Sequence, residues 1–199
     1  MATVPNRPLR ALVLIGTSTG GPKALTELFS HWKAVDGVAC CVVQHMPPGF
    51  TANLANRLNQ LSEWTVDEGV HGQPLVEKHV YIAPGGYQMR VTGSHSALQL
   101  AIAREDPVGG HQPSVDVLFD SAIPLASSLQ LVGVILTGMG RDGVKGLGGI
   151  RDVGGYTVAE SAESALIYGM PRVALESGAA MAGLPLSAIS NWLTERLAL

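Results

Sequence analysis

The sequence predicts an α/β fold: a doubly wound, mainly parallel sheet flanked by helices, with a small β-hairpin insertion. Three observations predict it. Short apolar runs rich in β-branched residues alternate with helix-like segments, as is typical of parallel strands covered on both faces. The 24 glycines and 12 prolines indicate many tight turns between short elements. A middle segment of shorter runs breaks the alternation, and we interpret it as the hairpin.

The first part of the chain contains two predicted strand–helix units. The apolar run 11–16 is a predicted strand, and a helix follows over 22–33. The run 37–45 is a second predicted strand. It is followed by a helix over 51–62, for which Thr51 is the predicted N-cap.

The middle of the chain contains the predicted insertion and one helix. The segments "HVYIAP", "YQMRVTG" and "ALQLAIA", within 79–103, are predicted short strands with Gly93 in a turn. The segment "PSVDVLFDSAIPLAS" predicts a helix with Ser114 as its N-cap, which Pro124 is expected to kink or end.

The last part of the chain returns to the alternating pattern. The run 131–138 predicts a buried strand, 142–153 a Gly-rich helix and 155–160 another strand. Helices near 161–167 and over 185–198 are expected to complete the fold.

The composition is that of one globular domain. The chain has 199 residues, 46% hydrophobic and 15% charged, which suits a buried core and not a disordered chain. A formal net charge of −3 and an aromatic share of 5% argue against a nucleic-acid partner. No stretch has the pattern of a membrane span or a signal peptide. We therefore predict a cytoplasmic protein without membrane insertion.

The only two cysteines, Cys40 and Cys41, are adjacent. On a strand their side chains point to opposite faces, so we interpret them as small buried apolar residues and not as a disulfide. Adjacency also departs from the spacing of zinc ligands.

Three predicted strand ends are candidate sites, because ligands of open α/β sheets bind outside the carboxyl ends of the strands. They are the segments 16–21, 45–51 and 137–143. The first contains G-x-S-x-G, with Ser18 at its centre. Ser18 is either a nucleophile on a tight strand-to-helix turn, a cap of the following helix, or part of a phosphate-binding loop.

His45 and Asp142 are the candidate partners of Ser18 at the other two strand ends. An imidazole accepts a proton from serine near neutral pH, although a lone histidine is more often structural. Asp142 either orients that histidine or caps the helix that it begins. The order Ser18, His45, Asp142 differs from that of the α/β-hydrolases, so that fold is excluded.

The backbone N–H groups around Gly138, Met139 and Gly140 are candidate oxyanion donors, because these residues leave their amides accessible. In this interpretation Met139 acts through its amide, with the thioether as an apolar wall.

Six segments of the chain form a set of motifs: "GTSTGG", "VVQHMPPGFT", "VYIAPGG", "HQPSVDVLFDSA", "GVILTGMGRDG" and "YGMPR". Together and in this order they resemble the catalytic domain of the chemotaxis protein-glutamate methylesterases, the CheB family, over about residues 10–197. The family's catalytic triad falls on Ser18, His45 and Asp142.

The resemblance also assigns supporting positions. Thr19 and His111 match active-site positions of the family, and Met139 matches its oxyanion donor. Arg141 stands where many relatives have a neutral residue, a difference that bears on receptor preference. The remaining histidines, His31, His71, His79 and His95, have no ligand spacing and are predicted to be solvated or structural.

The resemblance implies hydrolysis of glutamyl methyl esters on methyl-accepting chemotaxis receptors, with release of methanol and without a metal or organic cofactor. Some relatives also deamidate receptor glutamines. Members usually carry an N-terminal receiver domain; here residues 1–9 are expected to form a tail and 10–199 the catalytic domain. A receiver domain or another chemosensory protein is a possible partner.

Two alternatives differ in class. One is a non-catalytic binding module that has kept the fold, which loss of Ser18, His45 or Asp142 would have favoured. The other is a serine hydrolase that acts on a different protein or a small ester.

Overall fold

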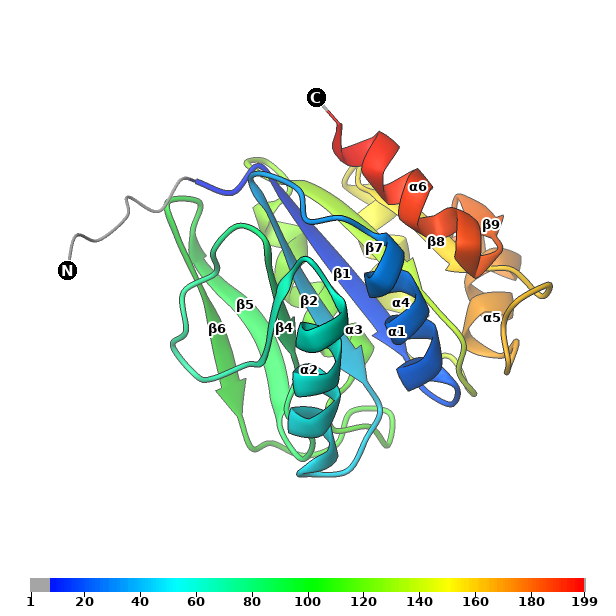
Figure 1. Cartoon of the computed structure of the whole chain (residues 1–199), viewed down its shortest axis with the longest axis horizontal. Helices are drawn as coiled ribbons and strands as arrows, with labels where there is room; N and C mark the ends of the chain where they lie inside the picture. Colours follow the sequence, from blue (N-terminus) through cyan, green and yellow to red (C-terminus); the bar gives the residue numbers. More distant parts are fainter. Residues whose placement is uncertain (1–7, 199) are drawn as a thin grey trace.

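Seven parallel strands form the main sheet, in the order β3-β4-β2-β1-β7-β8-β9 (Figure 1). The structure is a computed structural model that describes residues 8–198, so most of the predicted tail lies outside the described residues. The strands are β1 (Ala11–Thr17), β2 (Val38–Gln44), β3 (Thr65–Glu68), β4 (His79–Ile82), β7 (Gln130–Ile135), β8 (Tyr156–Glu160) and β9 (Ala182–Leu184). Every strand pair in this sheet is parallel.

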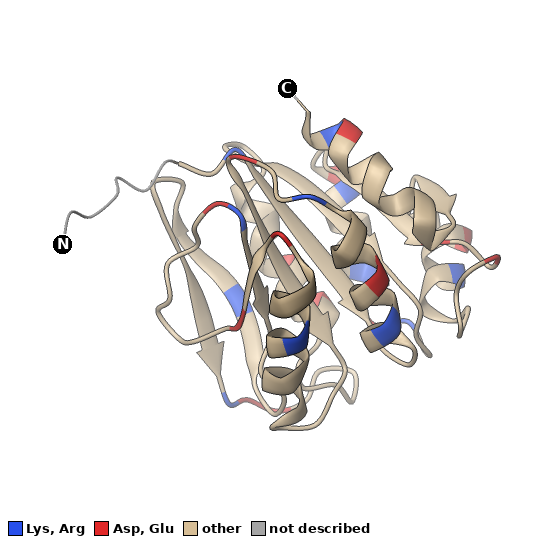
Figure 2. Cartoon of the chain, viewed as in Figure 1, with Lys and Arg blue, Asp and Glu red and all other residues tan. Residues whose placement is uncertain are grey.

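Helices cover both faces of the sheet, which confirms the doubly wound fold. One face packs on α1 (Gly21–His31), α2 (Phe50–Leu61) and α6 (Leu186–Leu197). The other packs on α3 (Val115–Ala122), α4 (Val144–Asp152), α5 (Met170–Glu176) and the hairpin β5 (Gln88–Ser94) and β6 (Ala97–Ala103). Charges of both signs are mixed over these helices in the view of Figure 2.

Side-chain alternation along the buried strands creates two separate cores. All seven residues of β1 and of β2 are buried, and neighbours along a strand point to opposite faces. Cys40 therefore packs in the core under α1 and Cys41 in the core under α3, as predicted. Both thiols are free.

The order of the strands places the site. β1 lies in the centre and pairs with β2 on one side and β7 on the other. The chain thus builds outward from β1 in both directions, and the carboxyl ends of these three strands meet where the strand order reverses.

The predicted insertion is smaller than expected. The segment "HVYIAP" supplies β4 of the main sheet, and only β5 and β6 form the antiparallel hairpin. Gly93, predicted in the turn, instead pairs with Leu98 inside the hairpin at φ +105°. A Cβ there would lie 2.2 Å from the carbonyl oxygen of Ala97, so close backbone approach explains this glycine.

The predicted helix over 161–167 is wrong, because backbone groups in this segment bond to distant elements. Ser161 N–H donates to Leu184 and Ile167 N–H donates to the Thr137 hydroxyl. The nearby helix is α5, which the sequence pattern did not predict, and Pro171 lies in its first turn. The edge strands β3 and β9 were also missed, because they are short and partly exposed.

Of the two predicted N-caps, Ser114 is correct and Thr51 is wrong. Ser114 is the N-cap of α3, and its hydroxyl accepts from Val117 N–H. Thr51 is not a cap: Gly49 precedes α2 in the left-handed region, and Thr51 instead donates to Glu68. α3 ends before Pro124, which lies in the short 3₁₀ helix η1 (Ile123–Leu125). Over the described residues, no helix is long and apolar enough to cross a membrane.

Candidate active site

The structure brings together the three strand ends that carry Ser18, His45 and Asp142. Ser18 follows β1, His45 follows β2, and Asp142 lies in the loop between β7 and α4. Backbone hydrogen bonds join the three segments: Ser18 N–H donates to the Thr137 carbonyl at 3.0 Å, and His45 N–H donates to the Thr17 carbonyl at 3.1 Å. These bonds continue the sheet pairing into the loops.

Ser18 is not the cap of the helix that follows it. The N-cap of α1 is Gly20, which has φ 87° and makes no side-chain cap bond. The half-buried Ser18 side chain therefore lies on the turn between β1 and α1, close to the partial positive charge at the start of α1.

Gln44 links the segments of Ser18 and His45, a role that the sequence analysis missed. Its amide is buried, and Nε2 donates to the carbonyls of Ser18 at 2.9 Å and His45 at 3.0 Å. A Cβ at Gly21 would lie 1.7 Å from Gln44 Oε1, which explains the glycine at that position. A polar residue closing an otherwise apolar strand was the available signal.

His45 and Asp142 form a close, buried pair. Nε2 of His45 lies 2.7 Å from Oδ2 of Asp142, and the two side chains are 10% and 6% exposed. The carboxylate also accepts from the Ser114 hydroxyl at 2.8 Å and from Val115 N–H and Asp116 N–H at 2.7 and 3.1 Å. Four donors therefore fix the orientation of Asp142.

Asp142 caps a helix, though not the one suggested by its place in the sequence. The N-cap of α4 is Gly143, at φ 89° and with no side-chain cap bond. Asp142 instead binds the N-terminal amides of α3. Burial raises the pKa of the Asp142 carboxyl, but the hydrogen bonds from His45 and from the start of α3 outweigh it, and the pKa lies below its ordinary value. The group is therefore a carboxylate near neutral pH.

The ionised carboxylate determines the tautomer of His45. A carboxylate only accepts, so Nε2 must carry the proton that it donates to Asp142. Nδ1 of His45 then holds the free lone pair, and it is buried without a hydrogen-bond partner among residues 8–198. The two ring nitrogens exchange the roles that they have in the serine proteases.

His111 stacks on His45, with ring centroids 3.8 Å apart and planes 4° from parallel. Burial, and then the neighbouring His45, lower the pKa of His111, so a neutral ring covers the proposed base. His45, His111 and Asp142 have ligand atoms within 4.8 Å of one another. In parallel stacked rings, however, the in-plane lone pairs do not converge on one point, which disfavours a shared metal ion.

Gly138 is not an oxyanion donor, contrary to the sequence-based expectation. Its N–H donates to the Ile167 carbonyl at 3.0 Å, and a Cβ there would lie 2.7 Å from the Cβ of Ser18. Gly138 therefore allows close packing against the serine. By contrast, the amides of Met139 and Gly140 have no hydrogen-bond partner among the described residues.

Thr19 lies directly after Ser18 and is exposed. Its carbonyl accepts from the Thr137 hydroxyl at 2.9 Å, while its own N–H has no partner in the described part of the chain. In hydrolases with a nucleophile elbow, the amide after the nucleophile is an oxyanion donor. The N–H groups of Thr19, Met139 and Gly140 are thus available as donors.

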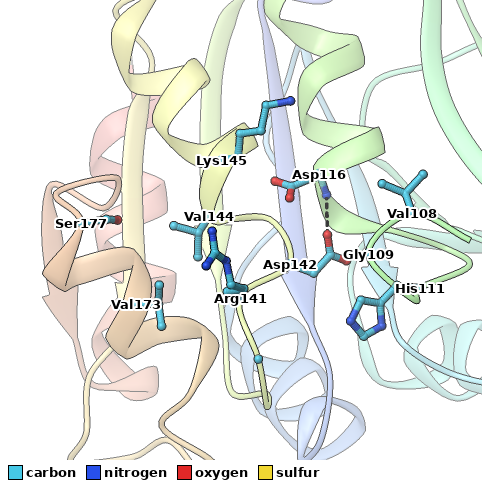
Figure 3. A pocket seen from close by; sticks show the side chains of 11 residues that line it. Val108, Gly109, His111, Asp116, Arg141, Asp142, Val144, Lys145, Val173 and Ser177 are labelled. Carbon is cyan, nitrogen blue, oxygen red and sulfur yellow. Dashed lines mark hydrogen bonds between the residues drawn. The ribbon is translucent and has the colours of Figure 1, made fainter.

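A cleft of about 640 Å³ lies beside these residues, between α3, α4 and α5 (Figure 3). His111 lies at one side and Val173 at the other, and Asp116 N–H bonds to Asp142 at its inner wall. Arg141 lines the cleft and forms no ion pair with any residue described. A free cation thus sits beside the Asp142 segment.

Comparison with known proteins identifies relatives over nearly the whole chain. The model of the family described as CheB methylesterase matches residues 13–193. A protein-glutamate methylesterase/protein-glutamine glutaminase of Symbiobacterium thermophilum is 48% identical over 185 residues, which cover 93% of this chain and 50% of the relative. A protein with the same name from Desulfitobacterium hafniense is 44% identical over 193 residues, which cover 96% of this chain and 49% of the relative. The chain spans about half the length of these curated relatives.

The crystal structure of the Thermotoga maritima CheB methylesterase catalytic domain has the same fold. It matches with a TM-score of 0.87 at 36% identity, over 94% of this chain and 98% of that one.

Proposed function

The chain belongs to the CheB methylesterase family, and from this premise we propose that it hydrolyses glutamyl methyl esters on methyl-accepting chemotaxis receptors, releasing methanol. The observation that carries the proposal is the buried His45–Asp142 pair. Nδ1 of His45 has no hydrogen-bond partner among the described residues, and His45 follows strand β2, which pairs with the strand that precedes Ser18. A nucleophile, a base and a group that orients the base are the three parts of such a hydrolase.

In the first half of the reaction, Oγ of Ser18 attacks the ester carbonyl and Nδ1 of His45 takes its proton. Asp142 stabilises the imidazolium through Nε2. Collapse of the tetrahedral intermediate breaks the bond to the methoxy group, which leaves as methanol with the proton from His45. A glutamyl ester of Ser18 remains.

In the second half, water attacks this acyl-enzyme and gives its proton to Nδ1 of His45. The Ser18–acyl bond breaks, Ser18 recovers its proton from His45, and the glutamate side chain leaves as the carboxylic acid, which then loses its proton to solvent. The oxyanion of each intermediate is stabilised by the amides of Thr19 and Met139, a kind of contact worth about 10²–10³ in rate. Apart from the substrate and water, these steps use only groups of this chain.

The surface around the site supports a protein substrate. Phe50, Met139 and Leu166 are 60%, 67% and 69% exposed, and each follows or adjoins one of the strand ends at the site. Exposed apolar groups gathered at one site are typical of contact with another protein. We place the reaction in the cytoplasm, and the two free cysteines are compatible with a reducing compartment.

Deamidation of receptor glutamines is a second candidate activity. The printed names of the relatives pair the esterase with a glutaminase. The same residues suffice in principle: Ser18 attacks the side-chain amide, and ammonia leaves in place of methanol with the proton from His45.

Methanol release from methylated receptor membranes tests the proposal, with native protein and Ser18→Ala side by side. We expect release only with the native protein. Ammonia release from receptors that carry glutamine at the same sites tests the second activity. A folded native protein that releases no methanol while it still hydrolyses a small ester would favour a serine hydrolase of different substrate, and inertness toward both would favour the binding module.

A further inference from the structure

Glu160 is a buried acid that the mechanism above does not use. It is the last residue of β8, is 1% exposed, and forms no ion pair with a described residue. Burial, and to a smaller degree the charge of Glu27, raise the pKa of its carboxyl. Because burying a carboxyl is unfavourable unless hydrogen bonds compensate, its contacts show what it does.

Both oxygens of Glu160 accept hydrogen bonds. Oε2 accepts from Thr137 N–H at 2.9 Å, and Oε1 accepts from the Ser164 hydroxyl at 2.8 Å. Ser164 in turn accepts from Leu186 N–H at 2.8 Å. Glu160 therefore joins the strand end after β7 to the loop between β8 and α5, and through Ser164 to the first residue of α6.

Thr137 carries this contact to the nucleophile. Its carbonyl accepts from Ser18 N–H at 3.0 Å and from the Thr17 hydroxyl at 2.8 Å. Its own hydroxyl donates to the Thr19 carbonyl and accepts from Ile167 N–H, both at 2.9 Å. Thr137 thus binds the side chain of Thr17 and the backbone of Ser18 and Thr19.

We propose that Glu160 is a positioning residue for the nucleophile: it fixes the Thr137 backbone, and through it the backbone around Ser18. The inference rests on the proposed function for its main readout. A misplacement of about 1 Å at a reacting group can cost about 10²-fold in rate. The reach of the Glu160 side chain is therefore the property that matters, because it sets where Thr137 lies.

Two variants separate the reach of the side chain from its charge. Glu160→Gln keeps the length and can accept from Thr137 N–H with its carbonyl oxygen. Glu160→Asp keeps the charge but draws the acceptor back by one methylene. Ser164→Ala is the matched control, because it removes the other hydrogen bond of Glu160 and leaves the bond to Thr137.

Methanol release from methylated receptor membranes is measured per folded molecule, and the inactivation rate by phenylmethylsulfonyl fluoride reports on the Ser18 hydroxyl. We expect Glu160→Asp to lower kcat about 10- to 100-fold, with KM within about twofold of native and the inactivation rate lowered in proportion. We expect Glu160→Gln and Ser164→Ala each to lower kcat by less than about threefold.

A loss of kcat in Glu160→Gln as large as in Glu160→Asp would overturn the proposal, since a side chain of native reach would then not be sufficient. Native kcat in Glu160→Asp would overturn the proposal as well. If Glu160→Asp does not fold, Glu160→Met takes its place: its side chain has a similar length but no oxygen to accept from Thr137 N–H, and native kcat there would reject the pathway through Thr137. If native protein reacts with the sulfonyl fluoride but releases no methanol, the proposed substrate is wrong. The inactivation rates of the variants would still test the role of Glu160 in that case.

Discussion

Two histidine–aspartate pairs of nearly equal local geometry lie in different parts of the sheet. His45 Nε2 is 2.7 Å from Asp142, and His79 Nε2 is 2.8 Å from Asp67. Each imidazole also stacks on another ring, with centroid distances of 3.8 and 4.4 Å. Distance and stacking therefore do not distinguish the two pairs.

Burial and neighbours do distinguish them. The Asp142 side chain is 6% exposed and accepts three further hydrogen bonds at the start of α3, whereas the Asp67 side chain is 54% exposed on the edge strand β3. His45 follows the carboxyl end of β2, beside the Ser18 segment, while His79 begins β4 at the opposite end of the sheet. A histidine–aspartate contact becomes a catalytic unit only where the carboxylate is fixed and a nucleophile lies beside the free nitrogen.

The largest expected effect is on the nucleophile and the base. Ser18→Ala and His45→Ala should each lower turnover by about 10³-fold or more, and the double variant should be hardly slower, because members of one catalytic unit fail together. His79→Ala, the matched control, should stay within about twofold of native. Methanol release measures all four. Losses that multiply in the double variant would show that Ser18 and His45 act independently.

The next effect concerns the two carboxylates. Asp142→Asn should lower turnover by up to roughly 10⁴-fold, because an amide that donates to Nε2 leaves the proton on Nδ1, where the base is needed. Asp67→Asn should have almost no effect on turnover. Thermal unfolding of both variants checks the fold. A collapse in stability with native activity per folded molecule would make Asp142 only a cap of α3.

A smaller effect is expected at the rim of the site. Arg141 is exposed and has no ion pair with residues 8–198, so an acidic receptor surface would be attracted to it. Arg141→Ala should lower kcat/KM by about 3- to 10-fold at low salt, and the difference should shrink as salt rises. The exposed Arg57 of α2 supplies the control, Arg57→Ala. A loss confined to kcat and insensitive to salt would place Arg141 in the chemistry.

The smallest effect is the pH dependence of the second pair. Burial lowers the pKa of His79 more than Asp67 raises it. Near this pKa the unfolded chain binds more protons than the folded chain, so the folded protein becomes less stable as the pH falls. The contribution of neutral His79 to the free energy of unfolding is complete above the unfolded pKa of about 6.5, and it is lost as the pH falls toward the lower pKa of the folded protein. Between pH 7.5 and 5.5, native protein should lose more unfolding free energy than His79→Gln, by less than about 1 kcal/mol. Urea unfolding measures this; the opposite sign would mean that Asp67 outweighs burial.

The sequence correctly predicted the features that depend on residues close together in the chain, namely the buried strands, the polar residues at their ends and one helix cap. The apolar runs of β1, β2 and β7 are buried strands, and the polar residues where they end, Ser18 and His45, lie at the site. Ser114 was correctly predicted as a cap because capping uses an amide three residues away. Turn chemistry and hydrophobic periodicity act over such short separations, so they can be read from one chain.

Contacts between segments far apart in the sequence determined the features that the sequence did not predict. Asp142 was expected to orient His45 or to cap its own helix, and the fold made it orient His45 while capping α3. The helix expected over 161–167 was displaced by bonds to Thr137 and Leu184. The choice of Nδ1 as the free nitrogen and the contact from Glu160 to Thr137 likewise depend on side chains from separate strands. Such contacts form only when the sheet aligns its strand ends, because their free energy comes from burial and geometry that no local pattern encodes.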